Sequence, residues 1–146
     1  MKIYLLRHAE RGHGEEQDTL SEKGRFQAEQ IKEHLKKLGI EKVYCASTDR
    51  SKETIKPFLK DFKGKVEYTP DLDEMRLGIL QGKTAQELRN AITNSGLSKE
   101  EFRPEGGENI EDFTNRIKNF VNKLRNETHE SILFLTHAGV IRNFIE

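Results

Sequence analysis

The stretch Ile3-Tyr4-Leu5-Leu6-Arg7-His8-Ala9-Glu10 combines two kinds of residue. Its first four residues are apolar and rich in strand formers, and such a short run is typical of a buried strand in a parallel sheet. Arg7 and His8 follow that run directly. Ligands of open parallel sheets bind outside the carboxyl ends of the strands. The sequence therefore predicts that Arg7 and His8 lie at a functional site.

The rest of the chain alternates between short apolar runs and longer amphipathic segments. The runs predict further strands at residues 43–46, 66–68 and 131–135. The amphipathic segments predict helices at residues 21–38, about 48–62, 84–94, 110–125 and after residue 139. This alternation predicts an α/β fold, a three-layer sandwich with a mostly parallel central sheet and helices on both faces. With 146 residues and no repeat or linker, we expect a single domain over residues 1–146.

Two of the predicted helices carry a recognisable apolar face. In the helix at 21–38, with Ser21 as its N-cap and Gly39 as its stop, the face consists of Phe26, Ala28, Ile31, Leu35 and Leu38. In the helix at 110–125 the face consists of Ile110, Phe113, Ile117, Phe120, Val121 and Leu124. We expect these residues to pack in the core.

Composition excludes several classes of function. The 25 basic and 25 acidic residues cancel, so bulk charge gives no reason to expect a nucleic acid or a membrane as partner. The single cysteine, Cys45, can form neither an internal disulfide nor a multi-thiolate zinc site, and we expect it in the core. No apolar stretch is long enough for a signal peptide or a membrane span. These features predict a cytoplasmic protein.

Other strand ends also carry side chains suited to phosphate. Ser47 and Arg50 follow the second predicted strand, Glu74 lies in the loop after the third, and His137 follows the last. Arginine matches phosphate oxygens with a planar fork of donors, a neutral histidine can attack phosphorus, and a carboxylic acid can protonate a leaving oxygen. Fixed cations of this kind need no metal. The set predicts a metal-independent site for phosphoryl transfer.

Each of these residues has a plainer interpretation when taken alone. An Arg-His pair after a strand is usually just the polar start of a loop. Arg50 alone would be interpreted as a solvated helix residue, and His137 alone as a helix cap. We interpret His13, His34 and His129 as surface residues because they lack such a setting. The second half of the zinc deaminase signature, the phosphate-binding P-loop and the dinucleotide-binding glycine pattern are all missing. Convergence of four strand ends is what favours catalysis.

Six segments in a fixed order resemble the histidine phosphatase superfamily, which contains phosphoglycerate mutase and many small phosphatases. They lie at residues 6–10, 20–28, 46–54, 72–82, 104–108 and 136–142, and they cover nearly the whole chain. The resemblance implies a phosphoglycerate mutase-like fold and a phosphoric monoester hydrolase without a cofactor. It implies a small-molecule phosphate ester as substrate.

The resemblance also implies a role for each site residue. His8 would be the nucleophile and form a covalent phosphohistidine. Arg7, Arg50 and His137, with Ala138 beside it, would bind the phosphoryl group, and Glu74 would protonate the leaving group and then activate water. No residue would bind a metal.

Two departures from the family pattern affect function. The loop at residues 11–18 contains no asparagine, unlike that of the mutase branch, which favours hydrolysis over mutase activity; Arg11, His13 or Glu15 would contact the leaving part of the substrate. The chain ends at Glu146, soon after the second histidine, and so looks short or truncated beside the family, which favours a homodimer. A cofactor-dependent phosphoglycerate mutase and a non-catalytic phosphate-binding domain remain as alternatives to a phosphatase.

Overall fold

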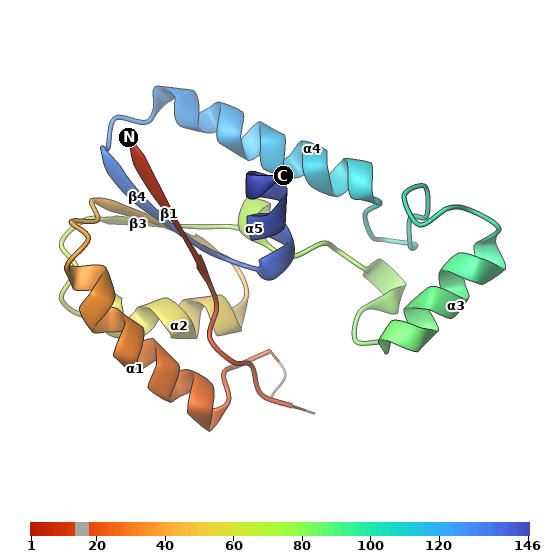
Figure 1. Cartoon of the computed structure of the whole chain (residues 1–146), viewed down its shortest axis with the longest axis horizontal. Helices are drawn as coiled ribbons and strands as arrows, with labels where there is room; N and C mark the ends of the chain where they lie inside the picture. The colour runs from red at the N-terminus through yellow and green to blue at the C-terminus, as the bar shows by residue number, and fades with distance from the viewer. Residues whose placement is uncertain (14–17) are drawn as a thin grey trace. The chain divides into compact units, whose positions relative to one another are not determined.

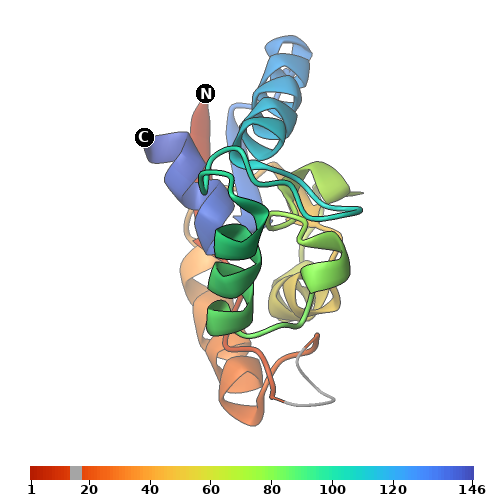
Figure 2. The ribbon, with the colours of Figure 1, turned by 90° about the vertical axis from the view of Figure 1, so that its right-hand side faces the viewer.

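The computed structural model describes residues 1–13 and 18–146 of the chain (Figures 1 and 2). These residues form two compact units, one made of Met1–Glu74 with Asn126–Glu146 and the other of Met75–Arg125. The first unit contains the sheet and the residues expected to carry the chemistry. Within the described ranges, no helix has the length and apolar character needed to cross a membrane.

The sheet of the first unit has four strands, all parallel. They are β1 (Lys2–Arg7), β2 (Lys42–Ala46), β3 (Lys65–Thr69) and β4 (Ser131–Thr136). Their spatial order is β1-β4-β2-β3, so β4 and β2 are central. Arg7 pairs with Thr136 at the end of β1 and β4, which brings the residues after both strands to the same edge. The predicted mostly parallel sheet is confirmed.

The two central strands form the core because they are buried on both faces. Val43, Cys45, Leu133 and Leu135 are fully buried and pack against side chains of the neighbouring helices. Such strands read as continuous apolar runs in the sequence, as these two do. Cys45 lies in the core as expected, and burial raises the pKa of its thiol to about 12, so it is not a reactive thiolate.

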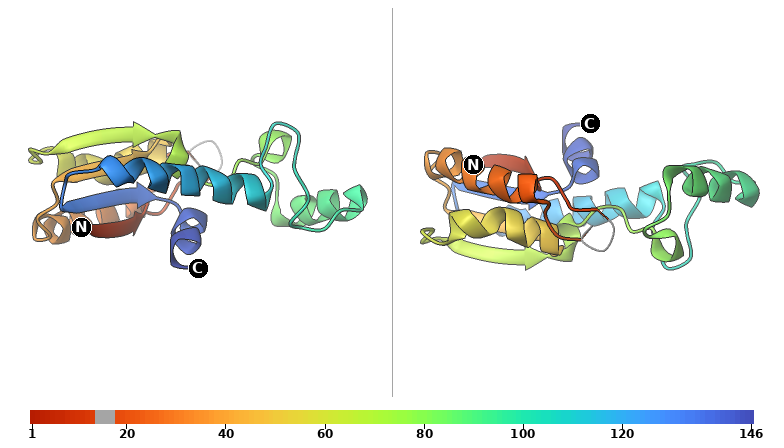
Figure 3. Two further views of the ribbon diagram at one scale, coloured as in Figure 1. Left: turned by 90° about the horizontal axis from the view of Figure 1, so that it is seen from above. Right: turned by 90° about the horizontal axis from the view of Figure 1, so that it is seen from below.

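Helices α1 (Glu22–Lys36) and α2 (Asp49–Leu59) pack together on one face of the sheet, as the view from below in Figure 3 shows. The Ser21 side chain caps α1 by accepting from the Gly24 N–H at 3.0 Å. Phe26 does not belong to the packed face, contrary to expectation, because its side chain is 62% exposed. On the helical repeat it lies on the opposite side of α1 from the buried residues Ala28 and Leu35.

Helix α5 (Ala138–Ile145) follows β4 and contacts β1 (Figure 2). The Phe144 ring of α5 packs at a tilt of 45° against Phe134 of β4, with ring centroids 5.6 Å apart. The helix therefore begins directly at the edge of the sheet where β1 and β4 end. This start places His137, the residue before the helix, at that edge.

The second unit contains α3 (Ala85–Ser95) and α4 (Ile110–Lys123), each started by a reciprocal capping box. Gly78 in its connecting turn has φ +56°, and a side chain there would collide with the carbonyl of Glu105. On α4, Phe113, Ile117 and Phe120 are buried, but Ile110 and Val121 are 36% and 41% exposed. The predicted apolar face was too wide, because the buried stripe follows only the positions three and four residues apart.

His129, expected on the surface, is partly buried: its side chain is 27% exposed and contacts a polar cluster of the first unit. Its Nδ1 lies 2.5 Å from a Glu127 oxygen, and the Tyr44 hydroxyl donates to the other oxygen at 2.5 Å. Lys42 completes the cluster at 3.2 Å. These contacts, the Tyr44 hydrogen bond foremost, hold the pKa of Glu127 well below its usual range.

Candidate active site

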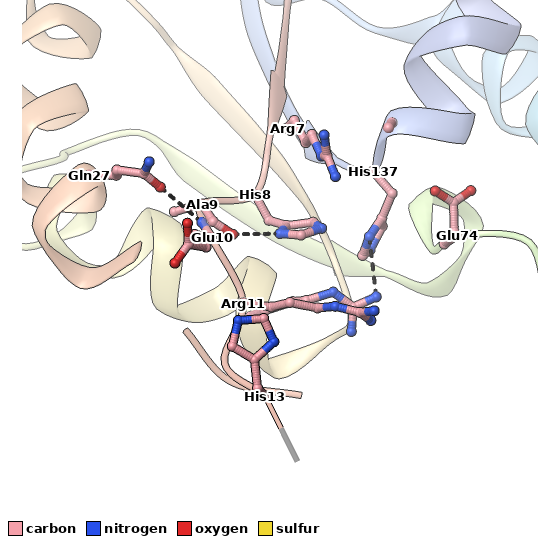
Figure 4. Close-up of a pocket in the computed structure, with 11 residues that line it drawn as sticks. Arg7, His8, Ala9, Glu10, Arg11, His13, Gln27, Glu74 and His137 are labelled. Atoms are coloured by element: carbon pink, nitrogen blue, oxygen red, sulfur yellow. Dashed lines mark hydrogen bonds between the residues drawn. The ribbon is translucent and has the colours of Figure 1, made fainter. Parts of the chain in front are cut away.

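The residues after the strands meet in one pocket of about 710 Å³. Arg7 ends β1, His8 follows it, Arg50 lies in the first turn of α2, and His137 follows β4. Figure 4 shows Arg7, His8, Glu74 and His137 facing this pocket together. Its lining consists of Arg7, His8, Ala9, Glu10, Arg11, His13, Gln27, Arg50, Glu74, His137 and Ala138.

The imidazole of His8 is held in one orientation by its own backbone. Its Nδ1 donates to the Ala9 carbonyl at 2.7 Å, as the dashed line in Figure 4 shows. Backbone carbonyls only accept, so this bond places the proton on Nδ1 and leaves the lone pair on Nε2. The Ala9 N–H in turn donates to Thr54 Oγ1 at 3.0 Å, and Thr54 donates to the Arg50 carbonyl at 2.7 Å. Thr54 thus connects the His8 loop to the start of α2.

The second histidine, His137, is almost fully buried, with 1% of its surface exposed. Thr48 Oγ1 donates to Ser51 Oγ at 2.8 Å, so the His137 Nε2–H is the donor in its 3.3 Å contact with Thr48. The other ring nitrogen, Nδ1, accepts from Arg50 Nη2 at 3.5 Å. The His137 ring meets the His8 ring edge-on, with centroids 4.9 Å apart.

Arg50 is a poorly satisfied cation in this pocket. Its Nε is buried and has no hydrogen-bond acceptor among the described residues. Its ion-pair contact is a 3.9 Å approach to Asp18, whose side chain is 80% exposed. Burial, followed by the nearby charge of Arg11, lowers the pKa of the Arg50 guanidinium. A bound anion would offset the cost of an unpaired buried donor, which is about 1–3 kcal/mol.

Glu74 faces the pocket from the loop after β3. One carboxylate oxygen accepts from the Gly139 N–H in the first turn of α5 at 3.0 Å. The preceding segment is fixed to the sheet edge, because Thr136 Oγ1 donates to the Leu72 carbonyl at 2.6 Å. Asp73 accepts from the Ser47 N–H at 2.7 Å and from the Ser47 hydroxyl at 2.5 Å. These bonds hold the Glu74 loop close to the end of β2.

The structure brings Arg7, His8, Arg50, Glu74 and His137 together, whereas Ser47 is not part of the lining and donates to Asp73. Arg11 and His13 of the following loop line the same pocket, and Ala138 does too. Glu15 lies outside the described residues. Sequence reasoning missed Thr48, Thr54 and Asp73, although all three lie within or beside the segments that carried the resemblance. Within residues 1–13 and 18–146, no cluster of three or more His, Cys, Asp or Glu residues has a geometry that could hold a metal ion.

The surroundings of His8 predict how it titrates. Burial lowers its pKa below the ordinary 6.5; the bond to Ala9 opposes this shift, and the charges of Arg50, Arg7 and Arg11 add to it. A pKa below 6.5 means that the His8 imidazole is mainly neutral at pH 7. Arg11→Gln removes a nearby positive charge, so we expect the His8 pKa to rise in an NMR titration of the imidazole. Arg89→Gln, on the exposed face of α3, is the control and should leave it unchanged. An unchanged or lower His8 pKa in Arg11→Gln would contradict this account.

Known proteins resemble nearly the whole chain. Residues 3–146 match the family model of the histidine phosphatase superfamily, branch 1. A probable phosphatase of Schizosaccharomyces pombe is 30% identical, over 97% of this chain and 70% of its own length. The adenosylcobalamin/alpha-ribazole phosphatase of Escherichia coli is 25% identical, over 97% of this chain and 75% of its own length. The crystal structure of the alpha-ribazole phosphatase from Shigella flexneri is 25% identical, with a TM-score of 0.84 over 99% of this chain and 78% of that one.

The chain therefore belongs to the histidine phosphatase superfamily. The similarity to solved structures confirms the predicted phosphoglycerate mutase-like α/β fold. The predicted enzyme class, a hydrolase of phosphate esters, is confirmed at the level of the family.

Proposed function

We propose that the protein is a phosphatase that hydrolyses small phosphomonoesters through a covalent phosphohistidine on His8. The observation that carries this proposal is the bond from His8 Nδ1 to the Ala9 carbonyl, which leaves Nε2 as the nucleophilic atom of the pocket. The buried, unpaired Nε of Arg50 supports an anion as the ligand. Arg7 and Arg50 would hold the phosphoryl oxygens and neutralise charge as it develops.

The reaction takes place in two displacements at phosphorus. His8 Nε2 forms a bond to phosphorus while the bond to the leaving oxygen breaks, and the Glu74 carboxylic acid gives that oxygen its proton. Water then attacks the phosphohistidine, and the Glu74 carboxylate accepts the proton of the water. Inorganic phosphate leaves, and His8 and Glu74 return to their starting states. No metal is required because the cations are fixed in the pocket.

His137 has a role that follows from its hydrogen bonds. In the unliganded site its Nδ1 accepts from Arg50. A phosphate dianion nearby would favour a second proton on this ring, because opposite charges stabilise the ionised form. His137 would then donate to a phosphoryl oxygen while Thr48 keeps the ring in place.

A substrate panel tests the proposal. The protein is incubated with an aryl phosphate and with sugar, nucleotide and glycerate phosphates, in the presence of a chelator, and inorganic phosphate is measured. We expect release of inorganic phosphate that the chelator does not change. Loss of turnover in the chelator, restored by magnesium, would contradict the mechanism. Transfer between glycerate positions without release would instead indicate a mutase, and phosphate binding without turnover would indicate a binding domain.

A further inference from the structure

The peptide that joins Ala9 to Glu10 is hydrogen-bonded on both of its sides, as the dashed lines in Figure 4 show. Its carbonyl, which belongs to Ala9, accepts from His8 Nδ1 at 2.7 Å. Its N–H, which belongs to Glu10, donates to the side-chain oxygen of Gln27 at 2.9 Å. A backbone N–H only donates, so the Gln27 atom that faces it is the amide oxygen and not the amide nitrogen. A chain of hydrogen bonds therefore runs from α1 through one peptide to the imidazole.

The planarity of the peptide makes these two hydrogen bonds depend on each other. A trans peptide holds its C=O and its N–H on opposite sides of one rigid plane. Because Gln27 fixes the direction of the Glu10 N–H, it also fixes the direction of the Ala9 carbonyl. Hydrogen bonds in series polarise one another, so the bond to Gln27 makes that carbonyl a stronger acceptor. Both effects strengthen its hold on the His8 Nδ1–H.

The start of α1 holds Gln27 in place beside this peptide. The Glu10 carbonyl accepts from the Ser21 N–H at 2.9 Å, and the Ser21 hydroxyl donates to the Glu10 carboxylate at 2.9 Å. At Gly24 the helix lies so close to Glu10 that a Cβ there would stand 2.0 Å from the Glu10 carbonyl oxygen. Ser21, Gly24 and Gln27 are spaced by three residues and therefore lie along one side of the helix. This side of α1 directs the Gln27 amide at the Glu10 N–H.

We propose that Gln27 is a positioning residue for the nucleophile: by accepting from the Glu10 N–H, it fixes the peptide whose carbonyl keeps the His8 proton on Nδ1. The lone pair then stays on Nε2. This inference rests on the proposed function, in which Nε2 attacks phosphorus. Thr54 has the matching position on the other side of Ala9, since it accepts from the Ala9 N–H at 3.0 Å. The loop after β1 is therefore held by one side chain of α1 and one of α2.

Two substitutions separate the hydrogen bond from the rest of the side chain. Gln27→Met keeps the length of the side chain and removes the acceptor, whereas Gln27→Glu keeps an acceptor. Nitrogen NMR of the unliganded protein, well above the His8 pKa, reports which ring nitrogen carries the proton. We expect the proton on Nδ1 in the wild type and in Gln27→Glu, and divided between Nδ1 and Nε2 in Gln27→Met. Gln30→Met, the same change at an exposed residue of α1, is the control and should keep the proton on Nδ1.

Turnover gives a second measurement. In Gln27→Met we expect kcat for an aryl phosphate to fall about tenfold, the size of one net hydrogen bond. Water can accept from the Glu10 N–H in place of Gln27, but it does not hold the peptide in one orientation. The Kd of inorganic phosphate should stay the same, because Arg7 and Arg50 are unchanged. Gln27→Glu should retain the wild-type kcat.

Two outcomes would overturn the inference. If the proton stays on Nδ1 in Gln27→Met, Gln27 does not position His8, and any loss of turnover arises from a direct contact with the substrate. If the proton moves equally in Gln27→Glu, the acceptor is not the group that matters. The NMR measurement does not depend on turnover: if no phosphate ester is hydrolysed, the proposed function fails, and the position of the His8 proton still decides the role of Gln27.

Discussion

His8→Ala is expected to reduce turnover of phosphate esters by about three to four orders of magnitude, because a nucleophile that forms a covalent intermediate has no substitute in the pocket. His8 Nε2 carries the lone pair, and the neighbouring His137 ring has its Nε2–H directed at Thr48. Inorganic phosphate release from an aryl phosphate, measured under steady-state conditions, gives the loss. The variant should still bind phosphate, since the arginines remain.

The proposed covalent intermediate can be tested directly. Rapid acid-free quenching followed by peptide mass spectrometry should locate one added phosphoryl group on the peptide that contains His8. His34→Ala is a matched control, because His34 is an exposed histidine of α1 outside the lining of the main pocket. The His34→Ala variant should retain both turnover and the phosphoryl adduct on the His8 peptide. An adduct that persists in His8→Ala, or one that forms on another residue of the wild type, would refute the assignment of the nucleophile.

Gly139→Ala is expected to reduce turnover of alkyl phosphates by about a hundredfold, the usual scale of general acid catalysis, without unfolding the protein. A side chain at residue 139 would meet the Glu74 carboxylate, with its Cβ 2.9 Å from the carboxyl carbon. The flexible end of Glu74 can move away, but it then loses its hydrogen bond to the residue 139 N–H and its place beside the leaving oxygen. Alanine favours a helix more than glycine by about 1 kcal/mol, so the melting temperature should not fall.

The choice of leaving group separates the loss of an acid from general damage. Nitrophenolate departs without a proton, so Gly139→Ala should lose far less activity on nitrophenyl phosphate than on an alkyl phosphate. Glu74→Gln should show the same pattern. Gly139→Ala in the Glu74→Gln background should add little further loss, because both changes act on one group. An equal loss on both substrates would argue that Glu74 is not the acid.

The main elements of the fold, and the position of several pocket residues, were predictable from where the strands end in the sequence. Continuous apolar runs identified β2 and β4, because strands buried on both faces leave no polar positions. Arg7, His8 and His137 were predictable because they follow strands directly, and the geometry of a parallel sheet then brings them to one edge. Glu74 was less certain than these residues, since it follows the third strand only after a loop, and a loop residue has no periodic signal.

Other features could not be predicted from local pattern. The exposure of Phe26 and Val121 depends on which residues finally pack against each helix, and the sequence of one helix does not contain that information. Thr48 precedes α2, where a threonine is usually interpreted as a helix cap, and Thr54 lies inside α2, where a threonine hydroxyl usually bonds to the carbonyl four residues earlier. Their contacts with His137 and Ala9 join residues 89 and 45 positions apart. Only the folded chain brings such pairs together.

The hydroxyl of Thr54 makes the two halves of the phosphate site mechanically dependent on each other. Thr54 Oγ1 accepts a hydrogen bond from the N–H of Ala9, whose carbonyl orients His8, and donates one to the Arg50 carbonyl. A shift of α2 would therefore move His8 and the Arg50 guanidinium together. A substitution in α2 that displaces this hydroxyl would therefore change the spacing between His8 and Arg50 without altering either residue.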